Sequence, residues 1–279
     1  MTTSSPPLPP LPLGATPGVV SSIRQAAQAT DMDFGLLLAQ AQQESGFQPD
    51  AKASGSSATG LFQFIESTWL AMVKRFGDKY GVGGLAQQIG TGANGHPQVT
   101  DPATRQRILD LRQDPRLSSA LAAEYARLNK SALEQALGRP AGSADLYLAH
   151  FLGSGGAVTF LKALGQSDST PAAELLPQAA AANHAVFYDA GSGRPRSLAE
   201  IYQDFATRIG REARQFSGLT VAGTPAAQAA TVAAPSLPFD ARQLAPPMAA
   251  MLNLFSLSAL KLLGDSGLPS LSLPPMSSL

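Results

Sequence analysis

Residues 33–69 read DFGLLLAQAQQESGFQPDAKASGSSATGLFQFIESTW, and this stretch decides the fold. In its first part, apolar residues recur at three- and four-residue spacing, which predicts one apolar face of an α-helix: Phe34, Leu37, Leu38 and Ala41. Glu44 is the next residue on that face. Because burying an isolated carboxylate is costly, we expect Glu44 either to have a partner or to hold its proton near neutral pH.

The residues after Glu44 form a predicted loop. Gly46 can end the helix in a left-handed cap, and a run rich in Pro, Gly and Ser then separates it from a second apolar segment at residues 60–63, Gly-Leu-Phe-Gln. This layout puts a carboxylate on a rigid helix and brings the amide of Gln63 back beside it. It is typical of an active site; the competing interpretation is a solvated or structurally paired Glu at a helix end.

These residues resemble two motifs of lytic transglycosylases of the soluble type, which share a goose-lysozyme-like fold. The matching positions are 43–47, 49, 53–54 and 58–63, with Phe62 where the family usually has Met. The resemblance covers about residues 19–211 and implies a mainly α-helical, lysozyme-like domain. It also implies a lyase that cleaves the β-1,4 bond between MurNAc and GlcNAc in peptidoglycan and leaves 1,6-anhydro-MurNAc ends.

In the reaction that the resemblance implies, Glu44 is the single acid and base. Most glycosidases carry two carboxylates, one to protonate the leaving oxygen and one to act at the anomeric carbon. In this sequence Glu44 is the one convincing candidate for a catalytic carboxylate. Glu66 is interpreted as a helix-dipole partner at a helix start, and Asp50 in the loop is a weaker alternative for a second acid.

Further residues are predicted to contact the sugar. Residues 149–153, Ala-His-Phe-Leu-Gly, resemble the family's Ala-Tyr-Asn-Ala-Gly motif, so His150 replaces its Tyr and Phe151 its Asn. Ligand contact and a structural role are equally open for His150. The predicted substrate-binding residues are Ser45, Ser54, Gln63, Ile65, Tyr147, His150, Phe151 and Tyr188.

The composition excludes several classes of function. Lys plus Arg and Asp plus Glu number 20 each and charged residues make up 14% of the chain, which argues against a nucleic-acid partner. There is no Cys, and the three His are scattered, so neither a metal nor another cofactor is expected. No phosphate-binding glycine loop and no apolar run long enough to span a bilayer occurs.

We expect a single folded domain between low-complexity ends. Residues 1–18 hold six Pro and no charge, which predicts a disordered arm, and residues 212–279 form a Pro- and Ala-rich tail with an apolar helix candidate at 248–263. Between them, residues 19–211 are the predicted domain, with a long helix after Asp114, two apolar helices broken near Gly153, and a last helix over 197–211. Trp69 is expected to be a core anchor rather than a sugar-stacking residue.

Three classes of function remain in competition: the transglycosylase, a hydrolytic lysozyme or endolysin-like muramidase, and a non-catalytic envelope assembly module. Peptidoglycan implies a periplasmic or envelope location in a bacterium, yet residues 1–18 lack signal-peptide features. We therefore expect delivery by a secretion, flagellar or phage-like apparatus, with residues 248–263 as the docking element.

Overall fold

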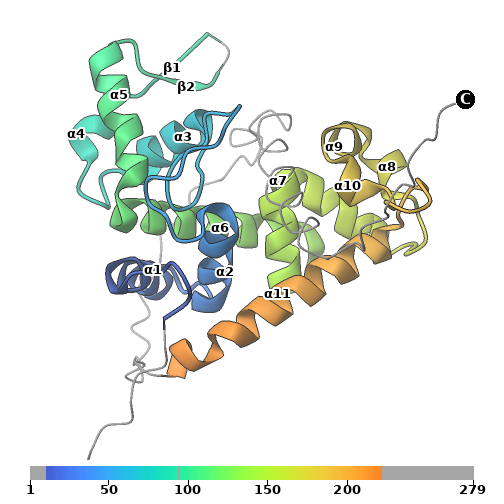
Figure 1. Cartoon of the computed structure of the whole chain (residues 1–279). Coiled ribbons are helices and arrows are strands. Elements are labelled where there is room, and N and C mark those ends of the chain that lie inside the picture. The colour runs from blue at the N-terminus through green and yellow to red at the C-terminus, as the bar shows by residue number, and fades with distance from the viewer. Residues whose placement is uncertain (1–10, 94, 222–279) are drawn as a thin grey trace, which may run out of the picture.

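The computed structural model describes residues 11–93 and 95–221, and helices dominate this part of the chain (Figure 1). The helices are α1 (Pro17–Thr30), α2 (Phe34–Ser45), α3 (Glu66–Phe76), α4 (Gly83–Ala86), α5 (Pro102–Asp110), α6 (Pro115–Leu137), α7 (Ser143–Leu164), α8 (Ala172–Leu175), α9 (Pro177–Ala182), α10 (His184–Phe187) and α11 (Leu198–Val221), with a 3-10 turn at Leu111–Gln113. Strands β1 (Gly90–Thr91) and β2 (Pro97–Gln98) pair antiparallel in a small hairpin. The mainly α-helical prediction is confirmed. None of the described helices combines the length and apolarity that crossing a membrane requires.

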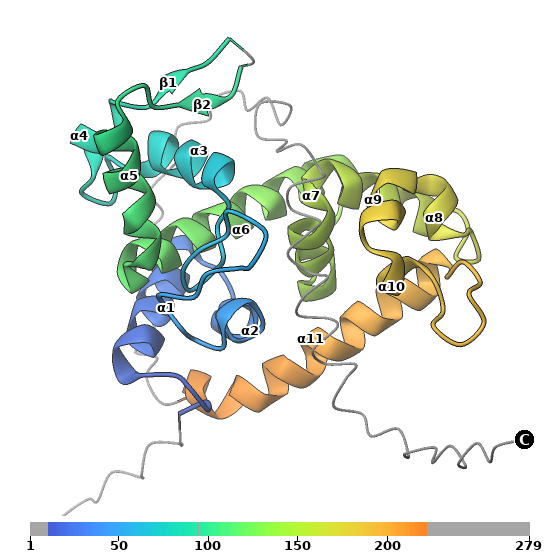
Figure 2. The ribbon, with the colours of Figure 1, turned by 45° about the horizontal axis from the view of Figure 1, so that its top comes forward.

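Helix α2 lies at the centre of the molecule. It packs against α1, α6 and α11, and Figure 2 shows it between α1 and α11 with α6 behind. Every residue from Gly35 to Ala41 is buried, whereas Phe34 is half-buried. The prediction of one apolar face was therefore too narrow, because three helices surround this segment and each buries a different side of it.

The long helix α6 forms the support on which α1 and α7 pack. Its start follows from the predicted capping: the Asp114 carboxylate accepts hydrogen bonds from the backbone N–H groups of Arg116 at 2.7 Å and Leu117 at 3.1 Å. Its end at Gly138 has a φ of 66°, which a left-handed cap requires. The predicted break is present at Gly153, whose φ of 72° and ψ of 161° are not helical, so α7 consists of two helical segments joined across a kink.

Trp69 anchors the lobe formed by α3 and α5. Its side chain is fully buried, and its indole N–H donates to the carbonyl oxygen of Ile108 at 2.7 Å. Its ring also meets that of Phe64 edge to face, with 5.2 Å between the centroids. The predicted core role of Trp69 is confirmed, and its hydrogen bond explains how an indole is buried without cost to its polar group.

Both ends of the predicted domain need correction. Helix α1 begins at Pro17, capped by Thr16, so the ordered chain starts before residue 19. Helix α11 runs on to Val221, ten residues past the predicted end, because Phe216 packs in the core against Phe47 with 6.4 Å between ring centroids. The predicted apolar helix at 248–263 lies outside the described residues.

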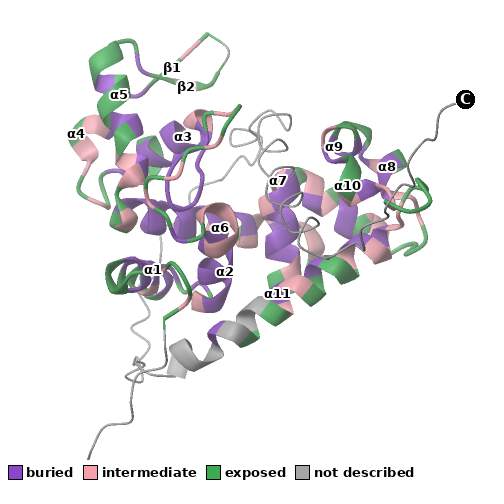
Figure 3. Cartoon of the chain, viewed as in Figure 1, coloured by how far each residue is buried: buried purple, intermediate pink, exposed green. Residues whose placement is uncertain are grey.

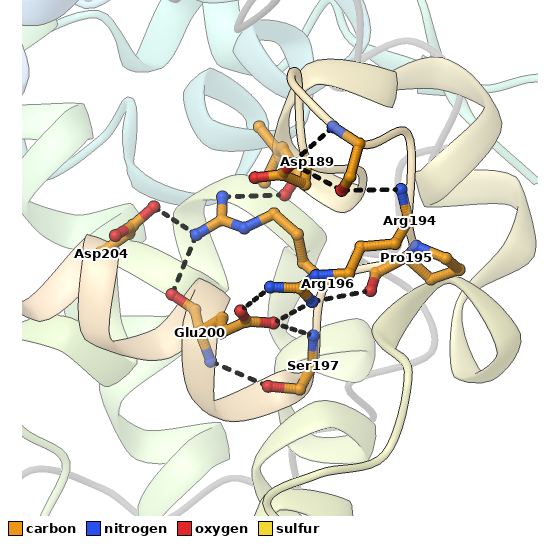
Figure 4. A network of polar contacts seen from close by, with 9 residues as sticks. Asp189, Arg194, Pro195, Arg196, Ser197, Glu200 and Asp204 are labelled. Carbon is orange, nitrogen blue, oxygen red and sulfur yellow. Dashed lines mark hydrogen bonds and ion pairs between the residues drawn. The ribbon is translucent and has the colours of Figure 1, made fainter.

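A polar network holds the start of α11 (Figure 4). Ser197 and Glu200 form a capping box: the Glu200 carboxylate accepts from the Ser197 N–H at 2.8 Å, and the Ser197 hydroxyl accepts from the Glu200 N–H at 3.2 Å. The Arg194 guanidinium pairs with the same carboxylate, and Arg196 pairs with Asp204. The hydrogen bond from Arg194, then that from the Ser197 backbone, lowers the pKa of Glu200 to about 2.

This lowered pKa predicts how stability depends on pH. The carboxylate stabilises the folded state above its ordinary pKa of about 4.5, and the contribution is lost as the pH falls toward 2. We expect Glu200→Gln to lower the melting temperature at neutral pH and the difference from wild type to shrink below about pH 4.5. Added salt should also reduce this difference in melting temperature, since the Arg194–Glu200 ion pair is at the surface. Glu174→Gln is the control, and a pH-independent difference would contradict this account.

Candidate active site

Glu44 lies in the last turn of α2, one residue before the helix ends at Ser45. Gly46 takes the left-handed conformation, φ 58° and ψ 34°, as the sequence predicted. The Glu44 side chain is only 9% exposed, and its Oε1 lies 2.9 Å from Nε2 of His150 on α7. Of the two states expected for Glu44, the structure shows the paired one.

Two neighbouring residues on α2 contact α7. The Gln43 amide and the Tyr147 hydroxyl are joined by hydrogen bonds of 2.6 and 2.9 Å, one turn of α7 before His150. Tyr147 is 1% exposed, and burial raises its pKa to about 12. Because Gln43–Tyr147 and Glu44–His150 form two adjacent connections between the helices, the Glu44 side chain is held in place from a neighbouring element.

A buried arginine holds the loop opposite Glu44. Arg112 is 8% exposed, and its guanidinium donates to the carbonyl oxygens of Ser57 at 2.6 Å, Phe64 at 3.1 Å and Leu109 at 2.9 Å. Burial lowers the pKa of this guanidinium, the direction expected for a desolvated cation. These bonds fix both ends of residues 57–64, the segment that carries Gln63.

Gly60 and Gln63 shape this loop from within. Gly60 has a φ of 89°, and a Cβ atom there would lie 2.1 Å from the carbonyl oxygen of Arg112. Gln63 also has a positive φ, 46°, which is unusual for a residue with a side chain. Its amide nitrogen donates to the carbonyl oxygens of Ala51 at 3.0 Å and Gly60 at 2.9 Å. The amide predicted to bind sugar thus also closes the loop.

A pocket opens between α2, the loop and α6. Its empty space is about 630 Å³, counted with the solvent at its mouth. The lining residues are Gln40, Glu44, Phe62, Gln63, Phe64, Ile65, Thr68, Ala122, Tyr125, Ala126, Asn129, Leu146 and His150. Glu44 is the only carboxylate in this lining. The walls are mainly apolar, with a few polar groups placed among them, as in a typical ligand site.

Of the nine predicted site residues, four line this pocket and a fifth contacts the loop that forms one of its walls. Gln63, Ile65 and His150 line it together with Glu44. Ser45 instead ties the end of α2 to the loop, because its hydroxyl donates to the carbonyl oxygen of Leu61 at 2.9 Å. Substrate contact by these residues stays a prediction.

The other four predicted residues lie outside the lining. Phe151 is 1% exposed and packs against Phe205, with 5.3 Å between ring centroids, because adjacent residues on a helix point in different directions. Contact of its ring with sugar was therefore the wrong expectation. Tyr147 is buried against Gln43, Tyr188 stacks on His184 at 4.2 Å, and Ser54 is exposed in the loop.

Four polar residues of the pocket were missed by sequence reasoning. Gln40 precedes Glu44 by one helical turn, a spacing that could have identified it. Tyr125 and Asn129 are likewise one turn apart on α6; burial raises the pKa of Tyr125 to about 12, while its hydrogen bond with Asn129 opposes that shift. The Thr68 hydroxyl is buried without a hydrogen-bond partner in the described part of the chain, which no sequence pattern would indicate.

The arginine that holds the loop leads to a prediction. Arg112→Met should lower the free energy of unfolding by roughly 1.5–3 kcal/mol, because a charged donor to buried carbonyl groups is lost. We expect hydrogen exchange to speed up over residues 57–64 and catalysis to weaken with it. Arg116→Met, at an exposed position near the start of α6, is the control. Equal stability and equal exchange in the two variants would show that Arg112 does not hold the loop.

One comparison with known proteins bears on this site. Residues 21–143 match the family model described as the transglycosylase SLT domain. The matched segment contains Glu44, the loop through Gln63 and all of α6, whereas His150 lies beyond it. Residues 21–143 thus carry a transglycosylase SLT domain, which indicates a peptidoglycan lytic transglycosylase, a lyase that cleaves glycan strands.

Proposed function

We propose that the protein cleaves the β-1,4 bond between MurNAc and GlcNAc with Glu44 as its single acid and base, and that it leaves 1,6-anhydro-MurNAc ends. The observation that carries the proposal is that Glu44 is the only carboxylate among the described residues that line the pocket. Its position at a helix end, largely buried but in contact with the pocket, suits a group that must pass a proton to substrate.

The proposed reaction returns its catalyst unchanged. The Glu44 carboxyl group gives its proton to the glycosidic oxygen, the bond from that oxygen to C1 of MurNAc breaks, and positive charge grows at C1. The C6 hydroxyl of the same sugar then forms the new bond to C1, and its proton passes to the Glu44 carboxylate. One carboxyl group serves both steps, and no water is consumed.

A hydrolase on the same scaffold needs a second carboxylate to activate water or to act as nucleophile. The two acids that the sequence offered are placed elsewhere. Glu66 pairs with Arg105, whose Nε donates to it at 2.7 Å, and Asp50 is an exposed loop residue. Neither lines the pocket, which favours the transglycosylase over the muramidase.

The experiment is digestion of purified peptidoglycan followed by mass spectrometry of the new ends. We expect anhydro ends from the wild type and none from Glu44→Gln. Reducing ends, heavier by one water, would identify a hydrolase. An uncut wall that still binds the protein would leave only the envelope assembly module.

The peptidoglycan substrate also leads us to propose that the protein acts in the cell envelope. A secretion, flagellar or phage-like apparatus remains our proposed partner, from the composition of the tail alone. Cell fractionation and affinity capture of the full chain test both points. Recovery only from the cytoplasm, without an apparatus component, would contradict them.

A further inference from the structure

We propose that His150 is a positioning residue for Glu44, whose Nε2–H holds Oε1 of the carboxyl group and leaves Oε2 to carry the transferable proton. The inference rests on the proposed function, in which Glu44 is both acid and base. The carrying observation is the 2.9 Å contact between His150 Nε2 and Glu44 Oε1, made by two side chains that both line the pocket.

The geometry gives the two carboxyl oxygens of Glu44 different roles. An Nε2–H that donates to Oε1 occupies that oxygen, so in the acid form the proton is on Oε2. When Oε2 gives up this proton, the same hydrogen bond becomes charge-assisted and stabilises the carboxylate that has formed. His150 therefore favours proton release in the first step and keeps Oε2 aligned to accept the C6 hydroxyl proton in the second.

A second connection between the two helices lies beside this contact. Tyr147 lies one turn earlier on the same helix and bonds to Gln43, the residue next to Glu44. Gly153 breaks the helical geometry three residues later. The imidazole thus lies between the turn that bonds to Gln43 and the kink, and it is 20% exposed, so it remains in contact with the pocket.

Two substitutions test the hydrogen-bond donor. His150→Gln keeps an N–H donor, whereas His150→Phe keeps a planar ring and loses the donor. His150→Phe should lower kcat roughly tenfold or more with KM little changed, because the hydrogen bond to Oε1 is lost. His150→Gln should restore most of the kcat that His150→Phe loses.

A purely structural role would give another pattern: both variants would lose activity and melting temperature together, with no rescue by His150→Gln, and that result would overturn the proposal. Should His150→Gln fail to fold, the imidazole ¹⁵N spectrum of the wild type decides the matter. We expect the Nε2–H tautomer at neutral pH, and an Nδ1–H tautomer with bare Nε2 facing Glu44 would also overturn it. Anhydro ends combined with either contrary result would refute only the role of His150, whereas hydrolytic ends would refute the proposed function itself.

Discussion

Glu44→Gln is expected to lower peptidoglycan cleavage by roughly 10²- to 10⁴-fold, the contribution of general acid–base catalysis, while the protein stays folded. Glutamine has the shape of glutamate and can still accept a hydrogen bond from His150 through its carbonyl oxygen, but it has no proton to transfer. Initial rates of glycan release, together with thermal unfolding of the same preparation, measure both parts of this expectation.

The matched control is Glu66→Gln, the same chemical change at the start of α3, where the carboxylate pairs with Arg105 at the surface. Its activity should stay close to that of the wild type, because exposed ion pairs contribute little. If Glu44→Gln kept more than about a tenth of the wild-type rate, another group would have to supply the proton.

Gly60→Ala should have the second large effect, on both stability and activity. The added Cβ would lie 2.1 Å from the backbone oxygen of Arg112. Because this neighbour is a backbone atom, it cannot move aside as the end of a flexible side chain could. The φ of 89° adds strain of its own. We expect the free energy of unfolding to fall by roughly 2 kcal/mol or more, from conformational strain and overpacking together, with loss of the loop geometry that places Gln63 at the pocket.

Gly55→Ala provides the control within the same loop. Gly55 has a φ of 96°, so alanine there carries the same kind of backbone strain, but no atom lies within 4 Å of the added Cβ. Urea denaturation of the two variants should show a clearly larger loss for Gly60→Ala. Equal losses would mean that strain alone, and not the close approach to Arg112, makes glycine necessary at position 60.

Local chemistry was predictable from the sequence. Asp114 caps α6, the long helix predicted to follow it. The placement of Glu44 at the end of α2, just before a left-handed glycine, was also predicted. Each of these features depends on residues within a few positions of one another, so spacing and residue type are enough to determine it.

The contacts that complete the site were not predictable in this way. Glu44 and His150 are 106 positions apart, and their contact depends on how α7 packs across the end of α2. His150 and Phe151 are adjacent, yet the helix turns one to the pocket and the other into the core against Phe205. No local pattern marks Arg112 as buried, and only the folded loop around it explains its burial.

Digestion of peptidoglycan in H₂¹⁸O, followed by mass spectrometry of the new ends, shows whether one carboxyl group cleaves the glycan without water. If the C6 hydroxyl closes on C1 with Glu44 taking its proton, the ends carry no ¹⁸O and lack the mass of one water. If each cleaved bond instead acquires one ¹⁸O atom at a reducing end, water is the nucleophile, and the account of Glu44 as the single acid and base of a transglycosylase is contradicted.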